Sequence, residues 1–233
     1  MIKVNFNYNL KKDAWSWVLI AKDKDMWGLN WRDQIVQIPD ELLVKIEKVS
    51  FSHAQKIIED CIEKDPKKEY KNKVMYSEIQ ALEKSWRMVE KKYFRILSKI
   101  TQRPIFTDKF NCYFTTGFVC PDNEKENWFM VSMWHSIAFS ITTICHEIMH
   151  LQFLHNYKKY LRNKGLKKDQ IEDLKESLTF LLNEQDFSDI ILCDDLGYPD
   201  HYKLRNKLQK IWHREKNFQK FIDLAIAEVK KKK

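Results

Sequence analysis

Apolar and polar residues alternate at the start of the chain, with apolar side chains at positions 2, 4, 6 and 8. This period of two predicts a half-buried strand. The segment 15–31 holds four tryptophans around Gly28 but shows no clear period, so we expect a loop lying over the core. Apolar residues at helical spacing then predict a helix over 39–64 and, after Asp65-Pro66, a longer one over 69–101.

Two strand-like runs follow, over 110–120 and 128–134, and the polar turn 121–124 between them predicts an antiparallel hairpin. The hairpin leads directly into an apolar helix that should end near Gly165. A second helix is expected over 169–185, and a last amphipathic helix after the turn 196–202. We therefore expect a single α+β domain over 1–233, mainly helical, with a small antiparallel sheet. An N-terminal strand and helical region would cover 1–104, and a core with the C-terminal helix 105–233.

The apolar helix carries the sequence His146-Glu147-Ile-Met-His150. Residues four apart lie on one face of a helix, so the two imidazoles can share a metal ion. Neutral imidazole is a good ligand for Zn²⁺, which lowers the pKa of a bound water to about 7, and Glu147 is placed to take that proton as general base. The alternative interpretation is a pair of core histidines beside a solvated glutamate.

A zinc hydrolase needs a third protein ligand and one open position. His155 lies about 140° around the helix from His150 and therefore points away from the metal. A glutamate on the second helix is the remaining route, because antiparallel helices with a rise of about 1.5 Å per residue bring 176–184 past His150. We expect Glu176, which lies on a polar stripe, with Glu184 and Glu172 as alternatives.

The order of helix, hairpin and H-E-x-x-H helix, together with the segment 175–183, resembles the zincin metallopeptidases over about residues 110–185, of either the gluzincin or the ImmA/IrrE type. The resemblance implies that 128–134 is an edge strand that pairs with an extended peptide substrate. It also implies a donor to the reaction's oxyanion downstream of the third ligand. We expect His201 in this catalytic role, ahead of Tyr198 and Tyr202, with Arg205 able to bind a carboxylate.

One part of the gluzincin pattern is absent. Thermolysin-like enzymes have an aspartate four residues after the ligand glutamate, where it orients a ligand histidine, and here that position is Phe180. Thr179, Asn183 or a backbone carbonyl would have to orient the histidines instead.

The formal net charge is +8, but lysines alternate with acids along most of the chain, which is typical of solvated helix faces. Nucleic-acid binding is not favoured, because the sequence shows no known binding motif. The sequence has five cysteines without a C-x-x-C pair, which indicates a reduced protein. It shows no signal core and no apolar run of about 18 residues, so we expect a cytoplasmic protein with no membrane partner.

The sequence therefore predicts a zinc-dependent hydrolase, a metallopeptidase that cleaves a narrow range of intracellular protein or peptide substrates. The oligomeric state stays open. A non-catalytic basic helical module that binds protein or nucleic acid, with an incidental or structural metal site, is the alternative from another class. A metal hydrolase acting on a non-peptide amide would share every residue assignment.

Overall fold

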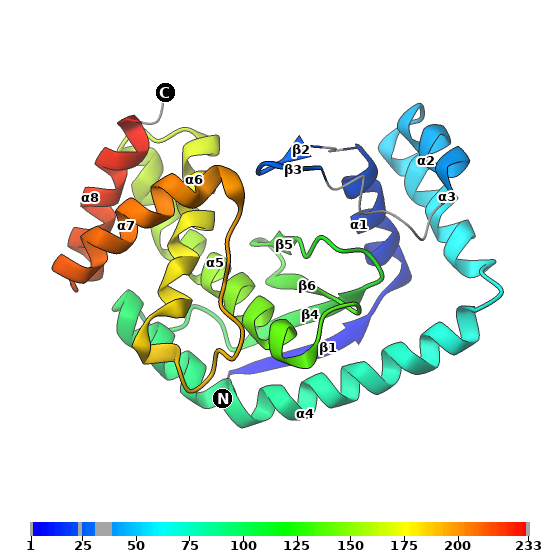
Figure 1. The fold of residues 1–233 in the computed structure, drawn as a ribbon, viewed down its shortest axis with the longest axis horizontal. Coiled ribbons are helices and arrows are strands. Elements are labelled where there is room, and N and C mark those ends of the chain that lie inside the picture. The colour runs from blue at the N-terminus through cyan, green and yellow to red at the C-terminus, as the bar shows by residue number, and fades with distance from the viewer. Residues whose placement is uncertain (1, 23–24, 31–38, 232–233) are drawn as a thin grey trace.

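The computed structural model describes residues 2–22, 25–30 and 39–231 (Figure 1). A four-stranded sheet lies at its centre, in the order β1 (Lys3–Tyr8), β4 (Lys109–Thr115), β6 (Trp128–Ser132) and β5 (Asp122–Asn123). Strands β1, β4 and β6 are parallel, and only β5 runs antiparallel to its neighbour β6. The mainly helical α+β class is confirmed, whereas the antiparallel sheet is wrong, because the sheet is mixed.

The predicted hairpin between 110–120 and 128–134 is also wrong. After β4 the chain crosses the end of the sheet and returns as the two-residue strand β5, so that β6 lies parallel to β4. The segment 121–124, expected as the turn, contains β5 itself, and the turn lies at 124–127, between β5 and β6. There Asn123 Oδ1 accepts hydrogen bonds from the backbone N–H groups of Lys125 and Glu126, and Asn127 has φ +53°. An alternating pattern predicts a strand, but it does not say which neighbour the strand pairs with.

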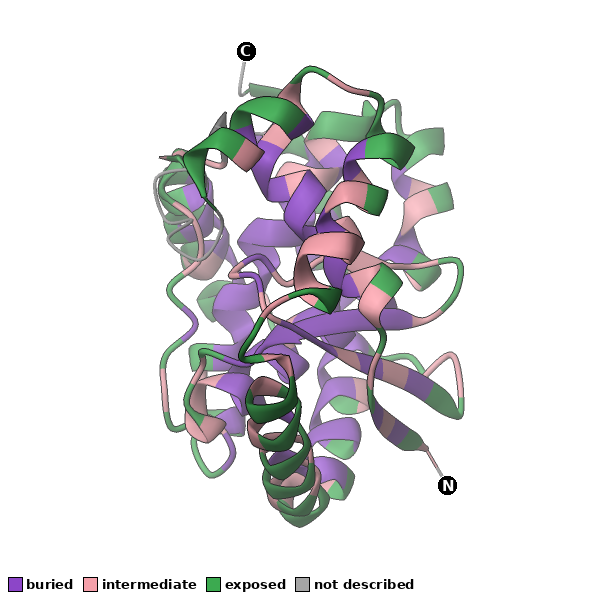
Figure 2. Cartoon of the chain, turned by 90° about the vertical axis from the view of Figure 1, so that its right-hand side faces the viewer, coloured by how far each residue is buried: buried purple, intermediate pink, exposed green. Residues whose placement is uncertain are grey.

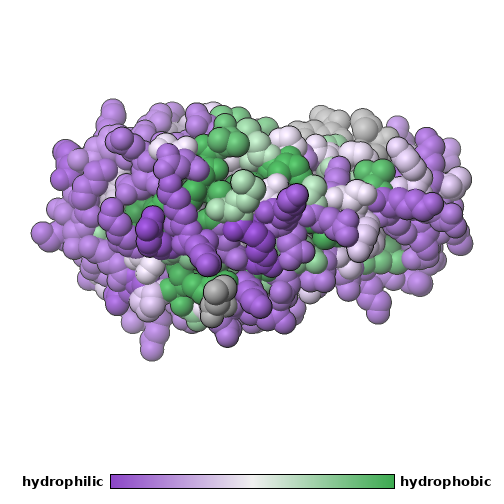
Figure 3. Space-filling model, turned by 90° about the horizontal axis from the view of Figure 1, so that it is seen from below, coloured by the Kyte–Doolittle hydropathy of each residue, from purple (hydrophilic) through white to green (hydrophobic). Residues whose placement is uncertain are grey.

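One face of the sheet packs on α4 (Lys68–Thr101) and α5 (Ile137–Asn163). Phe110, Phe129 and Ile148 are fully buried there, and Figure 2 shows buried residues gathered on the strands and on α5. Because β1 and α4 share this core with α5, residues on both sides of position 104 belong to one packed unit. The underside seen in Figure 3, along α4, is mainly hydrophilic, as expected for the outer face of a surface helix.

On the other side of the sheet, α1 (Leu10–Lys22) packs against the end of β4, where a loop was expected. Asn9 Oδ1 accepts from the N–H of Lys12 at the start of this helix, and Ser16 Oγ lies 2.7 Å from Thr115 Oγ1 of β4. Buried residues at positions 14, 17, 18 and 21 have helical spacing, so the sequence held a signal that the tryptophans obscured. A short ribbon of β2 (Asp25–Met26) and β3 (Leu29–Asn30) follows. Positions 23, 24 and 31 of the expected loop, Trp31 among them, lie outside the described residues.

Three other expected helices differ from the structure. The segment 39–64 forms two helices, α2 (Asp40–Glu47) and α3 (Phe51–Glu63), because Ser50 caps a new helix by accepting from His53 N–H. The segment 169–185 forms α6 (Lys168–Leu178) and then the 3₁₀ turns η2 (Thr179–Asn183) and η3 (Gln185–Phe187). After η4 (Pro199–His201), the last helix is in fact two, α7 (Tyr202–Arg214) and α8 (Phe218–Lys231).

Helix α5 ends at Asn163 and Gly165 follows with φ +83°, as expected for a left-handed helix terminator. By length and composition α5 could cross a membrane, but 72% of its apolar window is buried inside the structure. It is the central helix of the core: α6 packs along it, and Phe218 of α8 lies against Tyr157 in its C-terminal half.

Candidate metal centre

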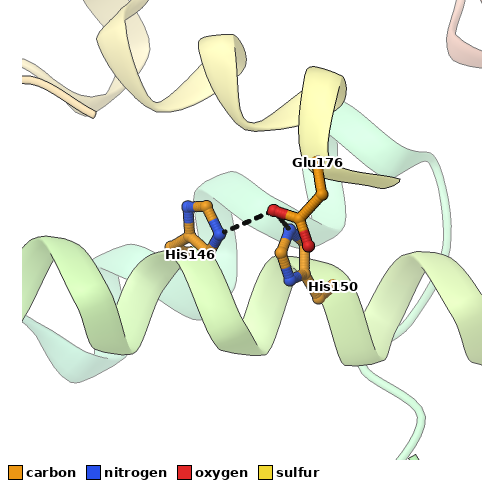
Figure 4. A group of neighbouring side chains, drawn as sticks. All are labelled: His146, His150 and Glu176. Carbon is orange, nitrogen blue, oxygen red and sulfur yellow. Dashed lines mark ion pairs between the residues drawn. The ribbon is translucent and has the colours of Figure 1, made fainter. Parts of the chain in front are cut away.

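Three side chains from two helices meet beside the sheet. His146 and His150 lie one turn apart on α5, and Glu176 reaches them from α6 (Figure 4). Glu176 Oε2 lies 3.5 Å from His146 Nε2 and 3.6 Å from His150 Nε2. One ligand atom from each residue falls within 4.8 Å of the other two, a spacing that a single cation can bridge.

The surroundings of these residues suit a bound metal ion better than a cluster without one. His150 and Glu176 are only 2% and 3% exposed, and His150 Nε2 and Glu176 Oε2 have no hydrogen-bond partner within the described part of the chain. Burying polar atoms without partners costs free energy, and a cation held between them removes that cost. Two imidazole nitrogens with one carboxylate oxygen form a ligand set that zinc hydrolases use.

The protonation states suit the same interpretation. Burial lowers the pKa of His150 well below its usual range, which keeps the ring neutral. Burial opposes the ionisation of Glu176, but the ammonium of Lys175 and the ring of His146 outweigh it and hold the pKa of Glu176 well below its usual range. A neutral imidazole and an ionised carboxylate are the forms that bind a metal.

Asp195 orients His146, and sequence reasoning missed it. Its Oδ2 lies 2.5 Å from His146 Nδ1. Burial disfavours the charged ring, but the Asp195 carboxylate outweighs burial and raises the pKa of His146 well above its usual range. A carboxylate on Nδ1 holds one proton there, so Nε2, which faces Glu176, is the atom that gives up its proton when the ring binds a metal, and the carboxylate makes the ring a more basic ligand.

Asp195 is itself held by three neighbours. Arg205 Nη2 donates to its Oδ1 at 2.6 Å and Thr179 Oγ1 donates to the same oxygen at 2.9 Å. Asn183 bonds both the N–H and the C=O of the Asp195 backbone. Thr179 and Asn183 thus act through Asp195, whereas Arg205, considered above as a carboxylate binder for substrate, is buried in this network. Phe180, at the expected aspartate position, is a core residue that packs against Phe221.

The other proposed ligands lie elsewhere. Glu184 lies 2.8 Å from His213 Nε2, and Glu172 pairs with Lys175 Nζ at 3.0 Å. Within the described residues, neither belongs to a group that could hold a metal ion. His155 is exposed and stacks on Phe106, with ring centroids 4.3 Å apart. Of the three expected glutamates, Glu176 is the one that lies beside both histidines within the described residues.

Glu147 lies where two cavities meet. One, of about 250 Å³, runs along α6 and β5, and the other, of about 270 Å³, runs along the N-terminal half of α5. Both are lined by Cys120, His146, Glu147 and Tyr198. Burial raises the pKa of Glu147 well above its usual range, which makes it a stronger proton acceptor. A water molecule and a substrate can therefore both reach this carboxylate.

The structure does not place His201 at this junction. Its ring is buried with Nε2 3.0 Å from Asp173 Oδ1, and it is not among the described residues that line either cavity. Tyr202 is 47% exposed at the start of α7. Tyr198 lines both cavities and stacks on Trp27, with ring centroids 4.6 Å apart. Burial and then the carboxylates of Glu176 and Glu147 raise its pKa well above its usual range, so the phenol keeps its proton.

On the side of the sheet next to the site, the edge strand is β5, not the segment 128–134. Strand β6 pairs with β4 on one side and with β5 on the other. The carbonyl of Pro121 accepts from the N–H of Met130 in β6 at 3.0 Å. Backbone groups alternate along a strand, so those of Asp122 point away from β6, towards the outer edge. Pro121 and Asp122 also line the cavity along α6.

No family model matches the chain, and no curated protein or solved structure matches it at a significant level.

Proposed function

We propose that this protein is a zinc-dependent hydrolase, a metallopeptidase of zincin-like design. One observation carries the proposal: His146, His150 and Glu176 converge, with His150 Nε2 and Glu176 Oε2 buried and unpartnered within the described residues, at a point where Glu147 faces two cavities. A purely structural zinc site is usually closed by four protein ligands, whereas a hydrolytic one keeps three and leaves a position open.

Each residue then has a chemical task. Zinc held by His146, His150 and Glu176 would supply the Lewis acid that acidifies water and polarises a carbonyl. Glu147 takes the proton from the attacking water and returns it to the leaving amine. We assign the oxyanion donor to Tyr198 in place of His201, because the phenol is protonated and lines both cavities.

An extended peptide fits the edge of the sheet. Adding to β5, it would use the outward backbone groups of Asp122 for hydrogen bonds and pass the junction of the two cavities. Cavities of about 250 and 270 Å³ each have room for one side chain or a short segment, which supports a narrow range of substrates. All five cysteines are free, which supports a reduced compartment such as the cytoplasm.

The test combines metal analysis with one substitution. We expect about one zinc per chain, and hydrolysis of a mixed peptide library that is lost in Glu147→Gln while zinc is retained. If the protein binds zinc but shows no activity that depends on Glu147, the hydrolase proposal is overturned. That result would favour the binding module with a structural metal. Activity on simple amides but not on peptides would retain the chemistry and change the substrate class.

A further inference from the structure

The two cavities that share Glu147 have different walls. The cavity along α5 has the apolar side chains of Leu29, Phe118 and Phe139 in its wall, beside His135 and two threonines. The cavity along α6 is lined by the carboxylates of Asp122 and Glu172, together with Trp15 and Trp27. A substrate lying across the junction would place its side chains in two unlike environments, one on each side of the bond that is cut.

Asp122 is the carboxylate in this wall with spare hydrogen-bonding capacity. Its Oδ2 is buried and has no hydrogen-bond partner in the described parts of the chain, while Oδ1 lies 3.6 Å from Lys175 Nζ. One oxygen of Asp122 is within 4.8 Å of ligand atoms of Glu147 and His150. A group bound to Asp122 would therefore lie within about one residue of the scissile bond, since neighbouring Cα atoms are about 3.8 Å apart.

The charge of this wall favours a cation. Lys175 is the buried ammonium at its centre, and it lies 3.0 Å from Glu172, 3.2 Å from Glu176 and 3.6 Å from Asp122. Glu147 adds a fourth carboxylate. The ammonium of Lys175 is thus shared among three of these carboxylates, and the Oδ2 atom of Asp122 has no partner among the described residues. A buried carboxylate oxygen without a partner is a position that a further cation can fill.

From this geometry we infer that the cavity along α6 binds an ammonium or guanidinium group of the substrate, with Asp122 as the specificity-determining residue. The neighbouring cavity takes an apolar side chain, so the cleaved bond joins a cationic residue to an apolar one. Trp15 and Trp27 suit the same ligand, because aromatic faces attract cations and pack against the apolar stem of lysine or arginine.

A second metal ion at Asp122, Glu147 and His150 is the competing cation. It would take up Glu147, which the proposed reaction needs as its base, and His150, which already faces the first metal. A substrate cation needs only the free oxygen of Asp122. The inference rests on the proposed function, because it names the substrate of the same site.

The test uses quenched fluorescent peptides with norleucine on one side of the cleaved bond and lysine, norleucine or glutamate on the other. We expect the wild type to have a kcat/KM about tenfold or more higher for lysine than for norleucine, and lowest for glutamate, since hydrogen bonds to charged groups are among the stronger ones. Asp122→Asn should lower the ratio of lysine to norleucine about tenfold. Glu124→Gln is the matched control, because Glu124 follows β5 and pairs with Lys158.

Two further measurements separate the outcomes. Acetylating the peptide N-terminus shows whether the cation is an α-amine, in which case cleavage is lost, or a side chain, in which case the lysine preference stays. Equal rates for lysine and norleucine, with acetylation having no effect, would overturn the inference while activity dependent on zinc and Glu147 still supports the hydrolase. Metal analysis of the wild type and of Asp122→Asn tests the competing cation. Two zinc ions per wild-type chain and one per variant chain would overturn the inference in favour of a second metal ion.

Discussion

Replacing Asp195 by asparagine should weaken zinc binding through the tautomer of His146. Arg205 and Thr179 both donate to Asp195 Oδ1, at 2.6 and 2.9 Å. In the variant these two donors fix the amide oxygen at the same place and turn the NH₂ group towards His146. The Nδ1 atom must then accept a hydrogen bond, so the ring proton moves to Nε2 and the lone pair that faces Glu176 is lost.

Partners that orient a metal-binding histidine typically contribute 10- to 100-fold to metal affinity or activity. We expect the upper part of this range, about 100-fold or about 2.7 kcal/mol, because the substitution reverses the hydrogen bond and does not merely remove it. The fold should survive with a loss of about 1–3 kcal/mol in the free energy of unfolding. Arg205 keeps its bonds to the Asp195 carbonyl and to Thr179.

The assay is zinc titration against a competing chelator, with urea unfolding as the check on stability. Asp194→Asn is the matched control, since it makes the same change at the neighbouring exposed position. The ¹⁵N chemical shifts of His146 report directly which ring nitrogen carries the proton. Zinc affinity equal to that of the wild type, or unchanged ¹⁵N shifts in Asp195→Asn, would refute the reasoning.

Glu176→Ala should abolish zinc binding, whereas Glu184→Ala should retain about one zinc per chain by elemental analysis; the reverse result would reassign the third ligand. Asp13→Ala should lower the free energy of unfolding in urea by about 3 kcal/mol or more, because Tyr8, Thr115 and Thr116 all donate to this buried carboxylate. A loss below about 0.5 kcal/mol, as expected for the exposed Asp108→Ala, would contradict this. Burial lowers the pKa of His135 from 6.5 to about 4. Between these two pH values His135 binds a proton in the unfolded chain but not in the folded one. Stability should fall as pH drops from 6.5 to 4, and His135→Gln should show a smaller fall; an equal fall would exclude His135 as the cause.

The sequence by itself determined the local features of the site. The spacing of His146 and His150 on an apolar helix is a property of five consecutive residues, and α5 presents them on one face as predicted. Helical rise and the polar stripe narrowed the third carboxylate to a few positions, with Glu176 preferred, and the structure brings that residue to the histidines. Long periodic helices such as α4 were also predicted, because helical periodicity depends on residues that are close together in the sequence.

Contacts between distant segments were decided only by the tertiary structure. Asp195 lies 49 residues from His146 in an irregular segment, and nothing in its local pattern distinguishes it from Asp194. Tyr198 and His201 are three residues apart, and the 3₁₀ turn that separates them sends one side chain to the cavities and the other to Asp173. The parallel pairing of β4 with β6 likewise depends on the path of the chain between them. Periodicity fixes which face of an element is buried, but the partner of that face depends on how the whole chain packs.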